Sequence, residues 1–270
     1  MSYHISKPSP LLAPFVKQYW VIENCLPAGS THVQRIVPSG LMDLMFYLGD
    51  KPEIADESRD LSECSVVSGQ QTGFFDIVVT GKMMLFSITF KPFGAKMFFN
   101  LPSTEFLNQY VPLKYFLKEP VGQIESELYE AASFAEKVAV AERFLFSLLK
   151  RNQCEQDLHR IMHSIDVINQ NKGIVNIDAL ATEACLSRKQ FERTFSAFIG
   201  ASPKQFLKTL RFQNTLHQKQ KSKNIQLTNL AYNCGYFDQS HMISDYKTMS
   251  GKTPSQYFAE CEPFSDYFNL

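Results

Sequence analysis

Residues 230–257 read "LAYNCGYFDQSHMISDYKTMSGKTPSQY" and decide the fold of the C-terminal part of this 270-residue chain. The stretch opens on Leu-Ala and turns at Cys234-Gly235-Tyr236. Asp238 then stands where a capping residue begins a second helix. Gly251 is placed to end that helix, and Pro254 to open the next one. Two short helices separated by a tight turn predict a helix-turn-helix.

An earlier stretch, "LATEACLSRKQFERTFSAFIGASPKQF" at residues 180–206, repeats this pattern. Side chains four apart share a helix face, so we expect the paired apolar positions to be buried core residues. The Leu-Ala pairs lie 50 positions apart and the later pairs 51, so the second copy has one extra residue in its turn. The later equivalent pairs are Phe191/Met242, Phe195/Tyr246, Gly200/Gly251 and Pro203/Pro254.

The two copies predict helix-turn-helix motifs at about 177–199 and 227–249, joined by a helix over 203–220. A rigid connecting helix can place two recognition helices in successive major grooves, about 34 Å apart on one face of DNA. The predicted partner is therefore double-stranded DNA.

The candidate DNA contacts of the first copy follow Ser187, which we expect to cap the recognition helix. Lys189 and Arg193 are four apart on one face and could read guanine. Glu192 could accept a hydrogen bond from cytosine or orient Arg193. The candidate contacts are Arg188, Lys189, Glu192 and Arg193.

In the second copy, Asp238 is the predicted cap of a recognition helix that begins with hydrogen-bonding side chains. Short or planar polar groups suit base edges and phosphate oxygens. Backbone N–H groups at both helix N-termini add donors for phosphate. The candidate contacts are Gln239, Ser240, His241 and Ser244.

The distribution of charge agrees with a polyanion at one end of the chain. Residues 1–153 carry 14 Lys and Arg against 16 Asp and Glu, whereas residues 171–260 carry 12 against 6. A basic C-terminal region joined to a slightly acidic remainder indicates that only the C-terminal region meets nucleic acid.

The first 90 or so residues have the pattern of short strands. The runs "FVKQYWVIEN", "LMDLMFYLG", "FFDIVVTG" and "MMLFSITF" are rich in β-branched and aromatic residues and are bounded by turn residues. Apolar spacing then predicts one long amphipathic helix over 123–151. That helix packs on the barrel or forms a dimer seam. The predicted class is α+β, with a small N-terminal β-barrel or sandwich carrying helices (1–153) and an all-α module of two helix-turn-helix motifs (154–270).

Aromatic and methionine side chains in the N-terminal region would line an apolar effector pocket or fill an ordinary core equally well. The candidate effector contacts are Arg35, Asp43, Tyr47 and Trp20, of which Arg35 and Asp43 are charged groups beside apolar strands. The alternative is a domain that only dimerises or binds a protein partner.

An enzymatic role is disfavoured by the motifs. A cupin-like metal enzyme needs clustered histidines, but residues 1–153 hold only His4 and His32. The six cysteines are scattered, so we expect reduced and mostly buried thiols and neither a metal nor a cofactor. No secretory signal or membrane-length apolar run is found, which favours the cytoplasm and no membrane partner.

Residues 230–257 closely resemble the signature of AraC/XylS-type bacterial transcription regulators: Leu-Ala, Cys-Gly-Tyr, Tyr246 late in the helix, then Gly-x-Thr-Pro and Tyr257. Phe258 and Ser244 depart from it, since basic residues are frequent there, so affinity is expected to depend more on the first copy. The segments "IVPSGLMDLMFYLG" and "FSITFKPFGAKMFF" loosely resemble a sensor domain of such regulators. The partners expected beside DNA are a small-molecule effector, RNA polymerase and a second copy of the chain. We expect an activator, but the sequence leaves activation and repression open.

Overall fold

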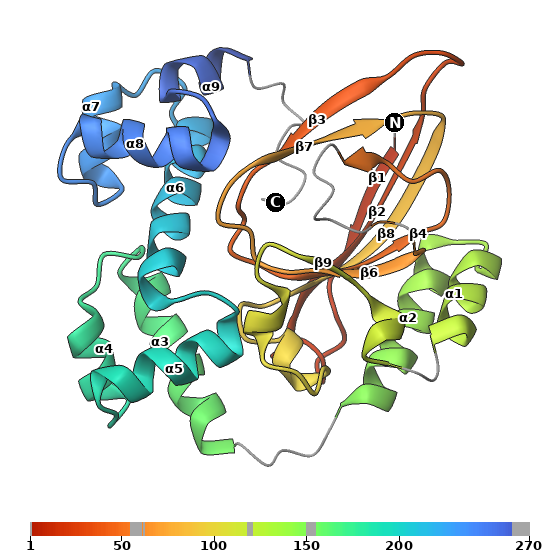
Figure 1. Ribbon diagram of the computed structural model, residues 1–270, viewed down its shortest axis with the longest axis horizontal. Coiled ribbons are helices and arrows are strands. Elements are labelled where there is room, and N and C mark those ends of the chain that lie inside the picture. The colour runs from red at the N-terminus through yellow and green to blue at the C-terminus, as the bar shows by residue number, and fades with distance from the viewer. Residues whose placement is uncertain (1, 55–60, 62, 118–120, 150–154, 261–270) are drawn as a thin grey trace.

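Two antiparallel β-sheets form the N-terminal half of the chain, and the C-terminal half is helical (Figure 1). The computed structural model describes residues 2–54, 61, 63–117, 121–149 and 155–260. The predicted boundary between residues 153 and 154 lies outside these ranges, so the division into two domains stays a prediction. The α+β class and the helical C-terminal module are confirmed.

The larger sheet has the strand order β1-β2-β8-β4-β6-β9, and the smaller sheet has the order β3-β7-β5. All four predicted strand runs are present, as β2, β4, β7 and β8. The strands of the larger sheet are β1 Ser2–Ser6, β2 Val16–Cys25, β8 Lys82–Phe90, β4 Asp43–Tyr47, β6 Ser65–Ser68 and β9 Tyr110–Pro112. Those of the smaller sheet are β3 His32–Ile36, β7 Phe75–Val79 and β5 Glu53–Ile54.

The inner face of the larger sheet packs against the smaller sheet. Trp20, Met45 and Tyr47 form one buried cluster with Ile36 and Phe75 of the smaller sheet. Within the described residues, no strand of the larger sheet is hydrogen-bonded to a strand of the smaller sheet. Of the two architectures that the sequence allows, the N-terminal region is therefore the sandwich and not a closed barrel.

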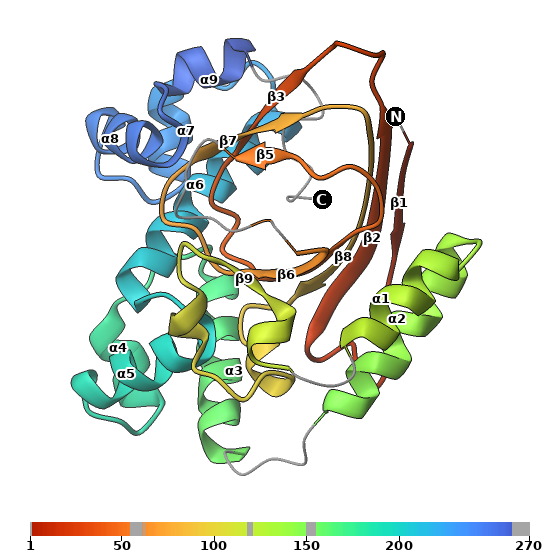
Figure 2. The same cartoon turned by 45° about the vertical axis from the view of Figure 1, so that its right-hand side comes forward.

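The outer face of the larger sheet is covered by α1 Val121–Glu130 and α2 Phe134–Leu148, which lie beside β1 and β2 (Figure 2). The prediction of one long helix over 123–151 was wrong. Ser133 begins a new helix, because its side chain accepts a hydrogen bond from the backbone N–H of Glu136. The Lys137 ammonium donates to the Leu128 carbonyl at the end of α1, so a buried cation satisfies the helix end at the break.

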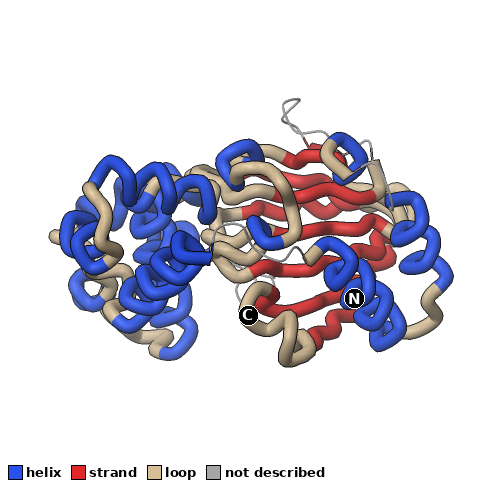
Figure 3. Tube along the Cα trace, turned by 90° about the horizontal axis from the view of Figure 1, so that it is seen from below, coloured by secondary structure: helices blue, strands red, loops and turns tan. Residues whose placement is uncertain are grey.

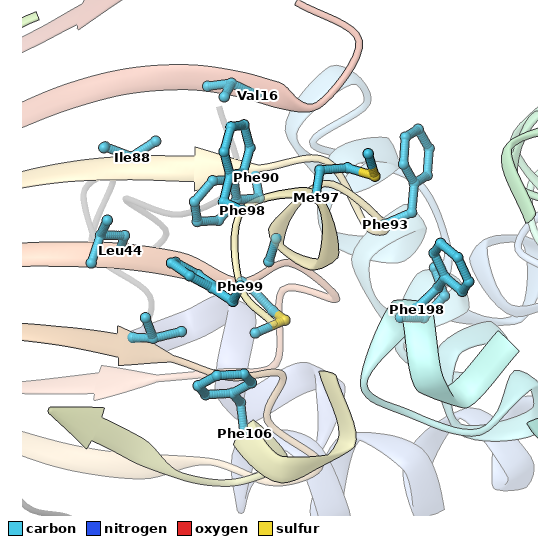
Figure 4. Packing of buried hydrophobic residues seen from close by; sticks show 14 of the residues in the cluster. Val16, Leu44, Ile88, Phe90, Phe93, Met97, Phe98, Phe99, Phe106 and Phe198 are labelled. Carbon is cyan, nitrogen blue, oxygen red and sulfur yellow. The ribbon is translucent and has the colours of Figure 1, made fainter. Parts of the chain in front are cut away.

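The C-terminal helices gather on one side of the strands (Figure 3). They are α3 Glu155–Gln170, α4 Ile177–Glu183, α5 Arg188–Ile199, α6 Pro203–Lys221, α7 Leu227–Asn233, α8 Gln239–Ser250 and α9 Pro254–Glu260. One buried cluster runs from the outer face of the larger sheet into α3, α4 and α5. Figure 4 shows Phe198 of α5 at the edge of this cluster, beside Phe93. The first cluster also includes Phe206 and Leu207 at the start of α6, whereas the rest of α6 and α7 to α9 share a separate cluster.

The four described cysteines are less buried than the sequence predicted, and Cys154 and Cys261 lie outside the described residues. Cys25, Cys64 and Cys185 are exposed free thiols, and Cys234 is the one buried thiol among the described residues. Each exposed cysteine lies at the end of an element or in a turn, where the chain reaches the surface. Burial raises the pKa of Cys234 to about 11, so this thiol is inert.

Candidate nucleic-acid interface

The first helix-turn-helix unit, α4 and α5, is built as its sequence predicts. The Ser187 side chain accepts a hydrogen bond from the Gln190 backbone N–H and Gln190 reciprocates, which makes a capping box at the start of α5. In the turn, Cys185 adopts a left-handed φ of 54°, and the Leu186 N–H donates to the Ala181 carbonyl over 3.0 Å. Phe191 and Phe195 are fully buried, so the helix shows the opposite face to solvent.

The second unit, α7 and α8, has the same turn. Gly235 takes the left-handed position with a φ of 77°, and the Tyr236 N–H donates to the Ala231 carbonyl over 3.0 Å. A carboxylate oxygen of Asp238 accepts the His241 N–H at 2.7 Å and begins α8. Met242 and Tyr246 are fully buried, as their counterparts in the first unit are.

The exposed face of α5 carries four charged candidates. Arg188, Lys189 and Arg193 are exposed, and Glu192 is half-buried. Arg188 is bound by two carboxylates, at 2.9 Å from Asp178 and 3.1 Å from Glu192. Glu192 therefore orients Arg188 and not Arg193, contrary to one of the two roles considered for it.

Lys189 and Arg193 differ from Arg188 in having no ion pair or side-chain hydrogen bond among the residues that the structure describes. Both lie on the exposed face of α5. Their cationic groups can therefore contact DNA without breaking an existing bond.

The exposed face of α8 is polar with few charges near its start. Ser240, His241 and Ser244 are exposed. Gln239 is half-buried, and its side-chain oxygen accepts a hydrogen bond from the Thr228 hydroxyl at 3.1 Å. The His241 ring stands edge-on to Tyr236, with ring centroids 5.1 Å apart. The four candidates thus share one end of α8, but two of them already have side-chain partners.

A buried carboxylate that sequence reasoning missed anchors α8 to α6. Asp245 is 4% exposed, and its oxygens lie 3.2 Å from the Lys208 ammonium and 3.9 Å from the Arg211 guanidinium. Its position could have revealed it, because the spacing 242, 245, 246, 249 defines one buried helix face. The ion pairs fix α8 on the connecting helix α6.

The C-terminal ends of α5 and α8 are bound by side chains of the N-terminal region. The Gln70 amide donates to the Ile199 carbonyl and the Ser103 hydroxyl to the Phe198 carbonyl, each over 2.8 Å. The Arg35 guanidinium donates to the Ser250 carbonyl over 2.9 Å. The last carbonyls of a helix lack intrahelical partners and carry partial negative charge, so these donors suit them.

Arg35 is held firmly at this contact. It makes two hydrogen bonds of 2.8 Å to Asp76, and its guanidinium lies 4.4 Å from the centre of the Phe74 ring. Its neighbour Ile36 points between the sheets, and alternation along a strand places Arg35 on the opposite face. The structure therefore places Arg35 toward α8, away from the other three candidate effector contacts.

Those three, Trp20, Tyr47 and Asp43, lie together on the inner side of the larger sheet. The Trp20 indole donates to the Thr89 hydroxyl at 2.9 Å, and that hydroxyl donates to Asp43 at 2.5 Å. Burial raises the pKa of Asp43 to about 6, although the bond from Thr89 and the charge of Lys17 oppose the rise. In the structure Asp43 is an acceptor, since the hydroxyls of Thr89 and Ser87 both donate to it.

Other kinds of site are absent from the part of the chain that the structure describes. No group of three or more His, Cys, Asp or Glu side chains there could hold a metal ion. None of the helices found there is long and apolar enough to cross a membrane.

Residues 180–260 match the family described as a helix-turn-helix domain, and residues 4–112 match a domain of unknown function, DUF6597. The HTH-type transcriptional regulator MtrA of Neisseria gonorrhoeae is 26% identical over 242 residues, which cover 83% of this chain and 79% of MtrA. An uncharacterized HTH-type transcriptional regulator of Haemophilus influenzae is 32% identical over 93 residues, 34% of this chain and 31% of that protein.

Two solved structures are also similar. The DNA-binding domain of AdpA, a global transcriptional factor crystallised with a target DNA, has a TM-score of 0.35 and 21% identity, covering 37% of this chain and 90% of that one. ToxT of Vibrio cholerae has a TM-score of 0.46 and 9% identity, covering 89% of this chain and 98% of ToxT.

Proposed function

Because this chain is a DNA-binding transcription regulator of the AraC type, we propose that α5 and α8 are its recognition helices and enter successive major grooves on one face of the operator. One observation carries the proposal. In both units the start of the second helix is exposed, whereas its last carbonyls are bound by the N-terminal region. The N-terminal end of each helix, which would enter a groove, is therefore the end that remains accessible to DNA.

The two helices would read DNA with different chemistry. Lys189 and Arg193 have no internal partner and suit guanine edges or phosphates, while Arg188 comes with two carboxylates attached. Ser240, His241 and Ser244 offer hydrogen bonds without a fixed charge. The first unit would therefore supply most of the salt-dependent affinity, and the second would contribute chiefly through hydrogen bonds.

Residues 35–43 are the proposed route by which the N-terminal region controls DNA binding. At one end Arg35 binds the end of α8, and at the other Asp43 lies on the inner side of the larger sheet. Between them the Pro38 carbonyl accepts a hydrogen bond from Gln213 of α6 at 2.5 Å, and Gly40 faces Thr209 of α6. A small-molecule effector that contacts Asp43, Trp20 and Tyr47 would move this segment and shift the population able to dock both helices.

Footprinting of the full chain tests the bipartite arrangement. The probe is the tightest duplex that the protein recovers from a randomised DNA library. We expect protection of two major grooves one helical turn apart on one face. Protection confined to one groove would contradict the proposal.

Arg193→Ala supplies the matched variant for this experiment. A bidentate contact with a base is worth about 1–3 kcal/mol, and its loss relaxes specificity at one base pair. Equal loss of affinity for the selected duplex and for random DNA would argue against base reading by Arg193. Contact with RNA polymerase, self-association, activation and a cytoplasmic location stay predictions.

A further inference from the structure

The structure identifies the extra residue of the second unit. The turn bond from Leu186 to Ala181 matches the turn bond from Tyr236 to Ala231, and the left-handed residues Cys185 and Gly235 precede Leu186 and Tyr236 directly. Leu186 is followed at once by the cap Ser187, whereas Tyr236 is followed by Phe237 and only then by the cap Asp238. Phe237 is therefore the inserted residue, and the first unit has no counterpart.

The ring of Phe237 is hardly buried within the protein. The residue before it, Tyr236, is turned inward and is only 3% exposed. Leu186, the counterpart of Tyr236 in the first unit, also packs inward, against the first cluster. Phe237 is 84% exposed, the highest value for a large apolar side chain among the described residues. Because so little of this ring is removed from water on folding, it contributes little to the stability of the folded chain.

The position of Phe237 directs the ring toward DNA in the proposed arrangement. It immediately precedes the cap of α8, at the helix end that carries Ser240 and His241. Those groups can hydrogen-bond to base edges but cannot recognise the methyl group that distinguishes thymine in the major groove. Phe237 supplies an apolar surface at the same end.

We infer that Phe237 is a specificity-determining residue that contacts the C5-methyl group of a thymine in the half-site bound by α8. The inference rests on the proposed function, because it requires α8 to lie in a major groove. It adds an apolar contact to a helix end otherwise equipped for hydrogen bonding, and it assigns that contact to the second half-site alone.

Replacing single thymines by deoxyuridine tests the inference, because deoxyuridine lacks only the methyl group. The full chain is titrated with the library-selected duplex and with versions that carry one deoxyuridine each. At one thymine of the α8 half-site we expect affinity to fall about three- to tenfold, the effect of losing one buried methyl contact. Phe237→Ala should bind the two versions equally, and Phe237→Leu should retain part of the difference.

Tyr232→Ala is the matched control. Tyr232 is an exposed aromatic residue of the same unit, at 59% exposure, but lies on α7. Its removal should leave the deoxyuridine effect unchanged. All three variants should melt like the unaltered chain, since neither ring is part of a core.

Several results would overturn the inference. One is a deoxyuridine effect of the same size in Phe237→Ala as in the unaltered chain, and another is no effect at any thymine of the half-site. Unchanged DNA affinity in Phe237→Ala with loss of transcription would assign the ring to a protein partner. If the unaltered chain selects no duplex at all, the proposed function itself is contradicted. That failure can be distinguished from failure of the inference, because it is seen before any residue is substituted.

Discussion

The two helix-turn-helix units share a turn but not a core. Phe191 and Phe195 of the first unit belong to the buried cluster that continues into the N-terminal sandwich. Met242 and Tyr246 of the second unit belong to a cluster of α6 to α9, to which the N-terminal region contributes Val37. The first unit is thus held by an apolar core that it shares with the sandwich, whereas the second unit is held mainly by an apolar core of the C-terminal helices.

The difference indicates which unit can move. Separating the first unit from the sandwich would expose apolar surface, such as the side chain of Phe198, which costs free energy in proportion to area. The second unit and the later part of the connecting helix α6 meet the sandwich through one buried apolar side chain, Val37, and through polar contacts of Arg35 with α8 and of Gln213 of α6, whose hydrogen bonds water can replace. We therefore expect the second unit to change position while the first stays attached.

Truncating one core residue in each unit should have the largest effect and tests most directly whether the two units have separate cores. Phe191→Ala should cost about 3–5 kcal/mol and Met242→Ala about 2–5 kcal/mol, because each leaves a cavity. Hydrogen exchange should rise in α4, α5 and residues 93–106 for Phe191→Ala, but only in α7 to α9 for Met242→Ala. Increased exchange of α5 in Met242→Ala would show that the cores are coupled.

The glycines that end the two recognition helices give the next effect. Both are left-handed, with φ of 91° at Gly200 and 71° at Gly251, and alanine there costs about 1–2 kcal/mol. A Cβ at 200 would lie 2.9 Å from the Ser103 backbone oxygen. One at 251 would meet the outer end of the Phe74 ring, which is partly exposed, and would lie 3.2 Å from Arg35 Nη1, a distance that a small shift relieves.

A ring can rotate away but a backbone oxygen cannot. Gly200→Ala should therefore lower the free energy of unfolding by about 2–3 kcal/mol and Gly251→Ala by only the 1–2 kcal/mol of the backbone. Thermal or urea unfolding of the two variants measures the difference. Equal losses of unfolding free energy would mean that the contact of the first unit with Ser103 adjusts as easily as the contact of the second unit with Phe74.

Arg35→Ala should loosen the second unit alone, by about 1–2 kcal/mol, since it removes hydrogen bonds of a charged group that is partly exposed. Hydrogen exchange should rise at the end of α8 and not in α5. Gln70→Ala is the control, because Gln70 binds the end of α5. Loosening of both helices by either variant would contradict separate attachment.

Acid should act on the same contact. The hydrogen bond from Arg35 holds the pKa of Asp76 below its ordinary value of 3.8. A lowered carboxyl pKa stabilises the folded protein above the unfolded pKa, and this contribution is lost as pH falls through the folded pKa. The Arg35 contact should therefore persist at pH 5 and weaken below about pH 4, an effect that Asp76→Asn should abolish.

The helix caps give the smallest expected effect. Asp238→Ala removes the acceptor of the His241 N–H and should cost about 1 kcal/mol, and Ser187→Ala should cost a similar amount in the first unit. Melting of the DNA-free chain measures both. An unchanged melting temperature with altered preference at one base pair would instead assign Asp238 to base reading.

Local sequence was sufficient where a residue acts through its own backbone neighbourhood. Ser187, Asp238 and Gly251 could be placed because a cap or a left-handed stop requires few residue types. The long helix over 123–151 was predicted from apolar spacing alone, which continues through Ser133 and therefore hid the break. Edge strands such as β1, with five residues, and β9, with three, are too short to produce a pattern.

The sequence by itself determined the two repeated units, their buried faces and the residues at the start of each recognition helix, because these depend on periods of three and four residues. Only the tertiary structure decided that Arg35 binds the end of α8 across 215 residues of chain, that Glu192 pairs with Arg188, and that Phe237 is the inserted residue. Contacts between distant segments depend on how elements pack, and packing leaves no period in the sequence of either partner.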